Sequence, residues 1–359
     1  MRTTPQTPEQ LTPLFLSQIL AHDVVARTIQ RIGQDEGFTG GSLFRITPTY
    51  RRATQDAPRS IVAKFSPADP EMRRRFATAN HREVAFYADL SAGKALPVPV
   101  CFFASFDPAT QASLLILQDL GDLRSVSFLA GCSAADAMHV AQAMARIHAT
   151  FWNHPILSSL NGAAILHEFS FRDAWRAYPE KVAALLPNMQ IPDSFLALGQ
   201  FISQHEEAVF DHLMEQPPLT LAHRDLQVDN IMFSMAEGDE ASVILDWQIV
   251  GKGRGVSDLA YFLISSLEPD TRRTSEGLIL ETYHGSLLRN GVADYDFAAC
   301  KRDYRTAVIT KIFVTVGATV FMDNASPHKT AWRATDLRRL LAFCQDHDLS
   351  EASFDFKPL

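Results

Sequence analysis

The stretch TLAHRDLQVDNIMF, residues 220–233, confines several polar side chains between two apolar runs. The polar residues are His223, Asp225, Asp229 and Asn230. The next apolar run ends in Asp246. Asn and Asp supply hard oxygen donors, which suit Mg²⁺ rather than Zn²⁺, and Mg²⁺ typically takes the rest of its shell from water and a substrate phosphate. The pattern therefore predicts a magnesium site at Asn230 and Asp246, with Asp225 free to meet a hydroxyl group.

Short strands must hold these residues in place. The run Leu219–Ala222 and the triplet Ile231–Phe233 are typical of buried strands, and Val243–Leu245 predicts another that ends at Asp246. Two strands joined by a turn form a hairpin, which delivers both polar segments to neighbouring positions. Loops that a rigid scaffold positions are where catalytic groups tend to occur. We therefore expect Asp225, Asn230 and Asp246 to converge.

A second pair of candidates lies earlier in the chain. In the predicted strand RSIVAKF, alternation places Ile61, Ala63 and Phe65 on one face and Lys64 on the other. In the following helix, MRRRFATANHREVAFYADL, Glu83 falls inside the apolar stripe. A carboxylate there is unfavourable unless it is paired, so Lys64 is the expected partner. The alternative is that Glu83 edges the stripe and reaches solvent.

The remaining pattern predicts an α+β protein. It opens with a helix from Pro8 to Leu20 that extends toward Ile29, followed by strands that form a sheet. Residues 1–120 are expected to form the sheet-containing lobe and residues 121–359 a mainly helical lobe. The first helix of that second lobe has Ser133 as its predicted N-cap. Further helices are expected at about 172–186, 194–213, 256–290 and 295–320.

Composition excludes several classes of protein. The chain has 33 basic and 41 acidic residues and a net charge of −8, which argues against a general nucleic-acid or anionic-membrane binder. Its four cysteines lie far apart without a CxxC pair, so neither zinc binding nor a disulfide framework is indicated. No signal-peptide pattern or membrane-spanning apolar run is present, and we expect a cytoplasmic protein.

Taken together, these motifs resemble those of the protein-kinase-like superfamily. The match is to its small-molecule branch, which contains aminoglycoside phosphotransferases and choline kinases. The closest resemblance is to the ecdysteroid-kinase-like family, on the motifs IVAKF, REVAFY, ARIHATFW, HRDLQVDNIMF and ILDWQ…GRGVSDLAYFL. The resemblance covers about residues 40 to 263. It implies a bilobal kinase-like fold and an ATP- and Mg²⁺-dependent kinase that phosphorylates a small-molecule hydroxyl.

The resemblance also implies roles for individual residues. Lys64 would hold the α- and β-phosphates and Glu83 would orient it. Asn230 and Asp246 would bind Mg²⁺, and Asp225 would accept the proton of the acceptor hydroxyl or orient it.

Backbone groups complete the implied nucleotide site. The glycine-rich stretch differs from GxGxxG, so the resemblance places only backbone near the phosphates there, at Gly40, Gly41 and Ser42. By position, the inter-lobe hinge whose backbone would bond the adenine comprises Leu117, Gln118, Asp119 and Leu120.

One departure from the small-molecule branch bears on the acceptor. The motif HRD is the one that protein kinases carry at this loop, whereas the small-molecule branch usually has Gly in place of Arg224. The segment between Asp246 and Asp258 is nevertheless too short for a phosphorylatable activation segment, and there is no APE sequence. We therefore expect a small-molecule acceptor and a structural Arg224 that pairs with an acidic neighbour.

Other residues have two interpretations each. His223 is expected to shape the loop by hydrogen bonding rather than to act as a catalyst, His148 to be a core residue or to border the acceptor pocket, and Asp258 to brace the loop or cap a helix. Aromatic residues that could line an acceptor site but are core residues by default are Trp152, Trp175, Tyr178 and Tyr283.

Three functions remain open. The first is a kinase for a lipophilic, sterol-like alcohol, because no dense acidic run suited to a polycationic aminoglycoside appears; choline-like, sugar and hydroxyacyl-thioester acceptors are alternatives. The second is a non-catalytic pseudokinase, although the lysine and both aspartates that such proteins commonly lack are present. The third is a metal-dependent hydrolase with His223, Asp225, Asp229 and Asp246 as ligands.

Overall fold

A computed structural model of the chain describes residues 4–32, 41–160, 170–235, 242–322, 326–350 and 353. The chain folds into two compact units. The first unit comprises residues 1–123 together with 244–250, and the second comprises residues 124–243 and 251–359. The chain therefore leaves the first unit, returns to it for one short segment, and leaves it again.

The first unit contains a five-stranded sheet in the order β1-β2-β3-β5-β4, in which every neighbouring pair is antiparallel. Its strands are β1 (Val24–Ile32), β2 (Ser42–Tyr50), β3 (Ile61–Phe65), β4 (Cys101–Phe106) and β5 (Ser113–Gln118). The central strand β3 alternates buried and half-buried side chains, as its sequence predicts. Lys64 therefore lies on the face opposite Ile61, Ala63 and Phe65.

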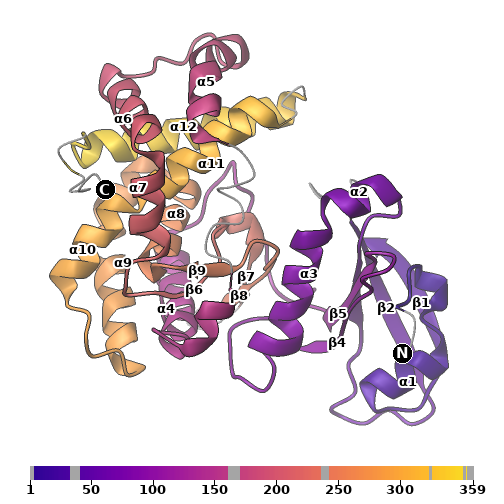
Figure 1. The fold of residues 1–359 in the computed structure, drawn as a ribbon. Helices are drawn as coiled ribbons and strands as arrows, with labels where there is room; N and C mark the ends of the chain where they lie inside the picture. The colour runs from indigo at the N-terminus through magenta and orange to yellow at the C-terminus, as the bar shows by residue number, and fades with distance from the viewer. Residues whose placement is uncertain are drawn as a thin grey trace. The chain divides into compact units, whose positions relative to one another are not determined.

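Each face of this sheet is covered by a helix (Figure 1). The helix α1 (Pro13–Leu20) packs Leu16 and Leu20 into a core with Ile61 and Phe65. On the other side run α2 (Pro70–Arg75), α3 (Ala77–Ala85) and the π-helical turn η2 (Phe86–Leu90). The predicted single helix is thus divided, and α3 contacts β4 and β5 on the face that carries Lys64.

The expected extension of the N-terminal helix toward Ile29 is wrong. A short 3₁₀ turn, η1 (Pro8–Gln10), precedes α1, and α1 stops at Leu20 because Ala21 adopts a left-handed conformation with φ 56°. Residues 24–32 then form the edge strand β1, paired along its length with β2. The β-branched residues of VVARTIQRI favour this extended conformation.

The second unit is mainly helical (Figure 1). Its helices are α4 (Ala134–Thr150), α5 (Phe171–Leu185), α6 (Asp193–Gln204), α7 (Glu206–Met214), α8 (Gly255–Ser266), α9 (Pro269–Arg289), α10 (Phe297–Thr306), α11 (Val308–Phe321) and α12 (Pro327–Asp346). Two 3₁₀ segments are η3 (Pro155–Ser159) and η4 (Val228–Asn230). Two small sheets pair β6 (Thr220–Ala222) with β9 (Gly251–Gly253) and β7 (Ile231–Phe233) with β8 (Ser242–Ile244). The mixed α+β class, with an antiparallel sheet followed by helices, is as predicted.

Helix boundaries in the second unit follow local chemistry. The Ser133 hydroxyl caps α4, and the Asp136 carboxylate completes a capping box, so the predicted N-cap is correct. The single helix expected over residues 194–213 is wrong, because it divides into α6 and α7 at His205. The helix α12 was not predicted.

The consecutive helices α10 and α11 form an apolar run. By length and composition alone, Phe297–Phe321 could cross a membrane, since an 18-residue window within it has a mean hydropathy of 1.2. However, 67% of that window is buried within the protein. Core helices of globular proteins show the same combination.

Candidate functional site

The predicted pair of Lys64 and Glu83 forms in the first unit. The Lys64 ammonium lies 2.8 Å from Glu83 Oε1. Glu83 is only 3% exposed, so the alternative that it reaches solvent is wrong. Burial raises the pKa of Glu83, and the Lys64 charge offsets part of that rise. Because Glu83 is buried and Lys64 is half-buried, the carboxylate needs the ammonium as its partner.

Asp246 belongs to the same cluster. Its Oδ1 lies 3.7 Å from the Lys64 ammonium. Burial would lower the pKa of Lys64, but the charges of Asp246 and Glu83 outweigh burial and raise it, so the lysine stays protonated. Asp246 has φ 60°, an uncommon conformation for a residue with a side chain. Such backbone strain clusters at functional sites.

The two residues after Asp246 attach this segment to the first unit. Trp247 is fully buried and stacks on Phe86, with ring centroids 3.9 Å apart and planes 6° from parallel. The Gln248 amide donates to Asn80 Oδ1 at 3.3 Å. Asn80 lies on α3, one turn before Glu83. The same contacts therefore set the positions of Asp246 and of the helix that carries Glu83.

The predicted nucleotide-binding backbone lies on strands that flank β3. Ser42 opens β2 and pairs with Phe65, the neighbour of Lys64, while Gly41 precedes it. Gly40 lies outside the described residues. Leu117 and Gln118 end β5, whereas Leu120 follows the strand.

Asp119 is held by its side chain. Its carboxylate accepts hydrogen bonds from the Arg45 guanidinium at 2.6 and 3.0 Å and from the Ser60 hydroxyl at 2.6 Å. Although burial acts against it, these partners hold the pKa of Asp119 below its usual range. Only the backbone of Asp119 is therefore available to a ligand.

Asp225 and Asn230 come together in the second unit. The Asn230 amide nitrogen donates to the Asp225 carbonyl at 2.9 Å and to Asp225 Oδ2 at 3.2 Å. The Tyr261 hydroxyl donates to Asp225 Oδ1 at 3.1 Å. Strands β6 and β7 bound this loop as predicted. Because the Asn230 nitrogen is used internally, its amide oxygen is the atom left to bind a cation.

Asp258 braces the backbone of this loop, one of the two roles expected for it. Its carboxylate accepts hydrogen bonds from the backbone N–H groups of His223 at 2.6 Å and Arg224 at 2.8 Å. His148 Nε2 lies 3.2 Å from Asp258 Oδ2, and His148 Nδ1 lies 2.8 Å from the Tyr283 hydroxyl. His148 and Tyr283 are fully buried, so both are core residues here.

Arg224 has a structural role, as predicted, and one acceptor that its guanidinium contacts is a backbone group. It donates to the Lys252 carbonyl and lies 3.6 Å from Met214 Sδ. The backbone of Arg224 has φ 71°. Gly251 leaves room for the guanidinium, since a Cβ there would lie 2.5 Å from Arg224 Cζ. A cavity of about 10 Å³ behind the loop is lined by Arg224, Asp258 and Tyr261 and could hold at most one water.

We expect Asp258→Asn to lower the free energy of unfolding by about 3 kcal/mol, because a buried carboxylate that accepts two backbone hydrogen bonds becomes neutral. Burial opposes ionisation, but His148, His223 and the Arg224 N–H hold the pKa of Asp258 below its usual value. A depressed pKa stabilises the fold above the unfolded-state pKa of about 3.9, and this contribution is lost as pH falls through the folded-state pKa.

The loss should therefore be full at pH 7 and should shrink below about pH 4. Urea unfolding measured across pH, with the exposed Asp270→Asn on α9 as the control, tests this expectation. Equal effects of the two substitutions at pH 7 would show that Asp258 does not brace the loop.

The grouping expected of a metal-dependent hydrolase does not form. Among the described residues, no three His, Cys, Asp or Glu side chains are arranged to hold a metal ion. His223 Nδ1 accepts from the Asp225 N–H at 3.2 Å, which is the loop-shaping role expected for it. Asp229 Oδ1 accepts from the Phe128 N–H at 2.9 Å instead of joining Asp225.

The role of Tyr261 and the stacking of Trp247 on Phe86 were not predicted from the sequence. Tyr261 lies within the quoted motif GRGVSDLAYFL, three residues after Asp258, so its place on the same helix could have drawn attention to it. Nothing in the sequence distinguishes Trp247 and Phe86 from ordinary core residues. Trp152 contacts Tyr295, while Trp175 and Tyr178 lie in an aromatic core with Phe171 and Phe195.

Comparison with solved structures supports the fold. A candidate aminoglycoside phosphotransferase from Ralstonia eutropha JMP134 aligns with a TM-score of 0.53 at 14% identity, covering 93% of this chain and 97% of that one. Choline kinase from Streptococcus pneumoniae aligns with a TM-score of 0.51 at 12% identity, covering 94% and 99%. Choline kinase from Cryptosporidium parvum Iowa II gives a TM-score of 0.51 at 12% identity, covering 90% and 89%. No curated protein matches this sequence.

The sequence itself matches a family model. Residues 38–299, well over half of the chain, match the phosphotransferase enzyme family (APH). The matched range contains Lys64, Glu83, Asp225, Asn230 and Asp246. The chain therefore belongs to the phosphotransferase enzyme family and is a phosphotransferase that acts on hydroxyl groups of small molecules.

Proposed function

We propose that this phosphotransferase is a kinase that uses ATP and Mg²⁺ to phosphorylate a small-molecule hydroxyl. The observation that carries the proposal is the cluster in the first unit, where the Lys64 ammonium lies 2.8 Å from Glu83 and 3.7 Å from Asp246. A lysine held by a buried glutamate is oriented toward anionic phosphate oxygens. The family match and the kinase-like fold support this role.

Mg²⁺ fits the residues assigned to it. Asp246 Oδ1 is shielded from solvent and accepts no hydrogen bond from the residues that the structure describes. The Asn230 amide oxygen is available because the amide nitrogen is the atom that donates hydrogen bonds to Asp225. Both are hard oxygen donors of the kind that Mg²⁺ prefers. When bound, the ion would neutralise charge on the phosphates, with Asn230 and Asp246 as its protein ligands.

We assign the nucleotide to β2, β3 and β5. The backbone of Gly40, Gly41 and Ser42 would lie near the phosphates, and the backbone of Leu117–Leu120 would bond the adenine. Lys64 pairs with Leu115 across the sheet, so Gln118 lies three residues, roughly 10 Å, farther along β5. That separation suits a ligand with phosphates at one end and a base at the other.

Asp225 is assigned to the acceptor hydroxyl. As the hydroxyl oxygen forms a bond to the γ-phosphorus, the bond between that phosphorus and the ADP oxygen breaks. The hydroxyl proton passes to the Asp225 carboxylate. Phosphoryl transfer needs mainly positioning and charge neutralisation, so the protein's task is to align these groups.

For the acceptor we propose a neutral, lipophilic alcohol of the sterol-like kind, as the resemblance to ecdysteroid-kinase-like proteins suggests. The sequence of the helical unit has no dense acidic run of the kind that a polycationic acceptor such as an aminoglycoside would call for. Choline-like, sugar and hydroxyacyl-thioester acceptors belong in the same screen.

Thermal unfolding of the wild type and Asp246→Ala, with ATP alone and with ATP plus Mg²⁺, tests the nucleotide site. A ligand at about 100 times its dissociation constant adds roughly 2.7 kcal/mol to native stability. We expect Mg²⁺ to increase the wild-type shift and the variant to lose that increment.

Asp107→Asn, in the turn after β4, serves as the control and should behave as the wild type. A wild type that responds to neither ligand would overturn the proposal. A magnesium-dependent shift without ADP release in a broad alcohol screen would instead indicate a non-catalytic nucleotide-binding protein.

A further inference from the structure

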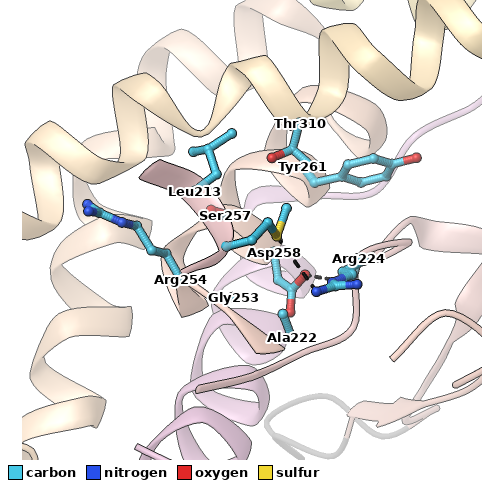
Figure 2. Close-up of a pocket in the computed structure, with 10 residues that line it drawn as sticks. Leu213, Ala222, Arg224, Gly253, Arg254, Ser257, Asp258, Tyr261 and Thr310 are labelled. Atoms are coloured by element: carbon cyan, nitrogen blue, oxygen red, sulfur yellow. Dashed lines mark hydrogen bonds between the residues drawn. The ribbon is translucent and has the colours of Figure 1, made fainter. Parts of the chain in front are cut away.

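The Asp225 carboxylate has a separate donor for each of its oxygens. Asn230 Nδ2 donates to Oδ2 at 3.2 Å, and the Tyr261 hydroxyl donates to Oδ1 at 3.1 Å. Tyr261 is 2% exposed, although Asp225 itself is only half-buried. In Figure 2 the Tyr261 ring extends away from the small cavity, with its hydroxyl at the outer end. Two donors on opposite oxygens fix the plane of the carboxylate.

The Tyr261 ring is held in turn by a buried ion pair. The Lys311 ammonium lies 4.3 Å from the centre of the ring. Lys311 also lies 2.6 Å from Asp336 Oδ1, and the Thr315 hydroxyl donates to Asp336 Oδ2 at 2.8 Å. Lys311, Asp336 and Thr315 are fully buried. A cation on the ring face attracts the π-electrons and makes the phenol a stronger hydrogen-bond donor.

The buried Lys311–Asp336 pair is an unfavourable arrangement if its only role is to stabilise the fold. Buried ion pairs contribute little net stability, and apolar residues of similar volume often serve equally well. Arg333 adds a second buried cation, 3.7 Å from Asp336. The chain nevertheless places this charge cluster behind the aromatic ring whose hydroxyl reaches the predicted catalytic carboxylate.

We propose that Tyr261 is a positioning residue that aligns the Asp225 carboxylate for the acceptor hydroxyl, and that the Lys311–Asp336 pair fixes the Tyr261 ring. The inference rests on the proposed function, because it gives Asp225 the acceptor. Tyr261 acts through Asp225 and touches neither nucleotide nor acceptor. Its loss should therefore lower kcat more than it raises the KM for ATP.

Tyr261→Phe tests this, since it removes the hydroxyl and keeps the ring under Lys311. Tyr304→Phe is a closely matched control. Tyr304 is 3% exposed and its hydroxyl donates to Glu276 Oε2 at 3.1 Å, the same bond in a part of the unit remote in sequence. Both variants should show a similar loss of melting temperature. We expect kcat to fall by about 10- to 100-fold in Tyr261→Phe only, with the KM for ATP within about twofold.

A double-mutant cycle with Asp225→Asn adds a second measure. If Tyr261 acts through Asp225, then Tyr261→Phe should change kcat by less than about twofold in the Asp225→Asn background. Full additivity, or equal kcat values for the two tyrosine variants, would overturn the inference. A wild type without any turnover would instead overturn the proposed kinase function, so the two failures are distinguishable.

Discussion

Asp225→Asn is expected to lower turnover on the order of 10²- to 10³-fold while the affinity for nucleotide changes by less than about twofold. The substitution keeps the size of the side chain and one acceptor for the Tyr261 and Asn230 donors. It removes the negative charge that would take the proton of the substrate hydroxyl. Steady-state ADP release, together with the thermal shift caused by ATP plus Mg²⁺, measures both quantities.

Asp229→Asn is the control for this experiment. Asp229 lies in the same loop as Asp225, but its carboxylate accepts a hydrogen bond from the Phe128 N–H. It should retain nearly full turnover. Comparable losses in both variants would point to a general disturbance of the loop, and Asp225 would then lose its assigned role.

Lys64→Met is expected to lower kcat/KM for ATP by a similar factor, on the order of 10²- to 10³-fold. The methionine fills most of the same space but cannot hold phosphate oxygens. It also leaves Glu83 buried without its cation at 2.8 Å, so the fold should be destabilised at neutral pH.

The pH dependence of that destabilisation has a definite sign. Burial raises the pKa of Glu83, and Lys64 offsets part of this rise in the wild type. An acid whose pKa is higher in the folded state binds its proton more tightly there, so stability falls as pH rises above the unfolded value of about 4.3. The cost of Lys64→Met should therefore be small below about pH 4 and largest at neutral pH.

Lys64→Met combined with Glu83→Gln separates stability from activity. The second change removes the uncompensated carboxylate, so the free energy of unfolding at pH 7 should recover toward the wild-type value. Activity should stay low because the ammonium is still absent. Recovery of activity in the double variant would contradict the phosphate-holding role of Lys64.

Local patterns were enough to predict part of this site. Strand alternation placed Lys64 opposite the core face, and helical spacing placed Glu83 on the inward stripe, so their pairing followed from two short periodicities. The loop between Ala222 and Ile231 was equally predictable from the sequence, because both flanking strands are short apolar runs. Each inference needed only a few adjacent residues.

Other features depend on tertiary contacts that no local pattern encodes. The Tyr261 hydroxyl meets a carboxylate 36 positions earlier, and Asn80 meets Gln248 across 168 positions. The edge strand β1 was mistaken for helix because apolar residues at helical spacing run past Leu20 into it. Pairing with β2 and the left-handed Ala21 decide its conformation instead.

The return of residues 244–250 to the first unit limits how the protein can be dissected. A fragment that stops at Leu123 contains the whole five-stranded sheet but lacks Trp247, so the face of Phe86 would be open to water. No single cut yields two pieces that each keep all of their own residues. Residues 244–250 would have to be added as a separate peptide, or joined to the sheet by circular permutation, to restore the stacking of Trp247 on Phe86.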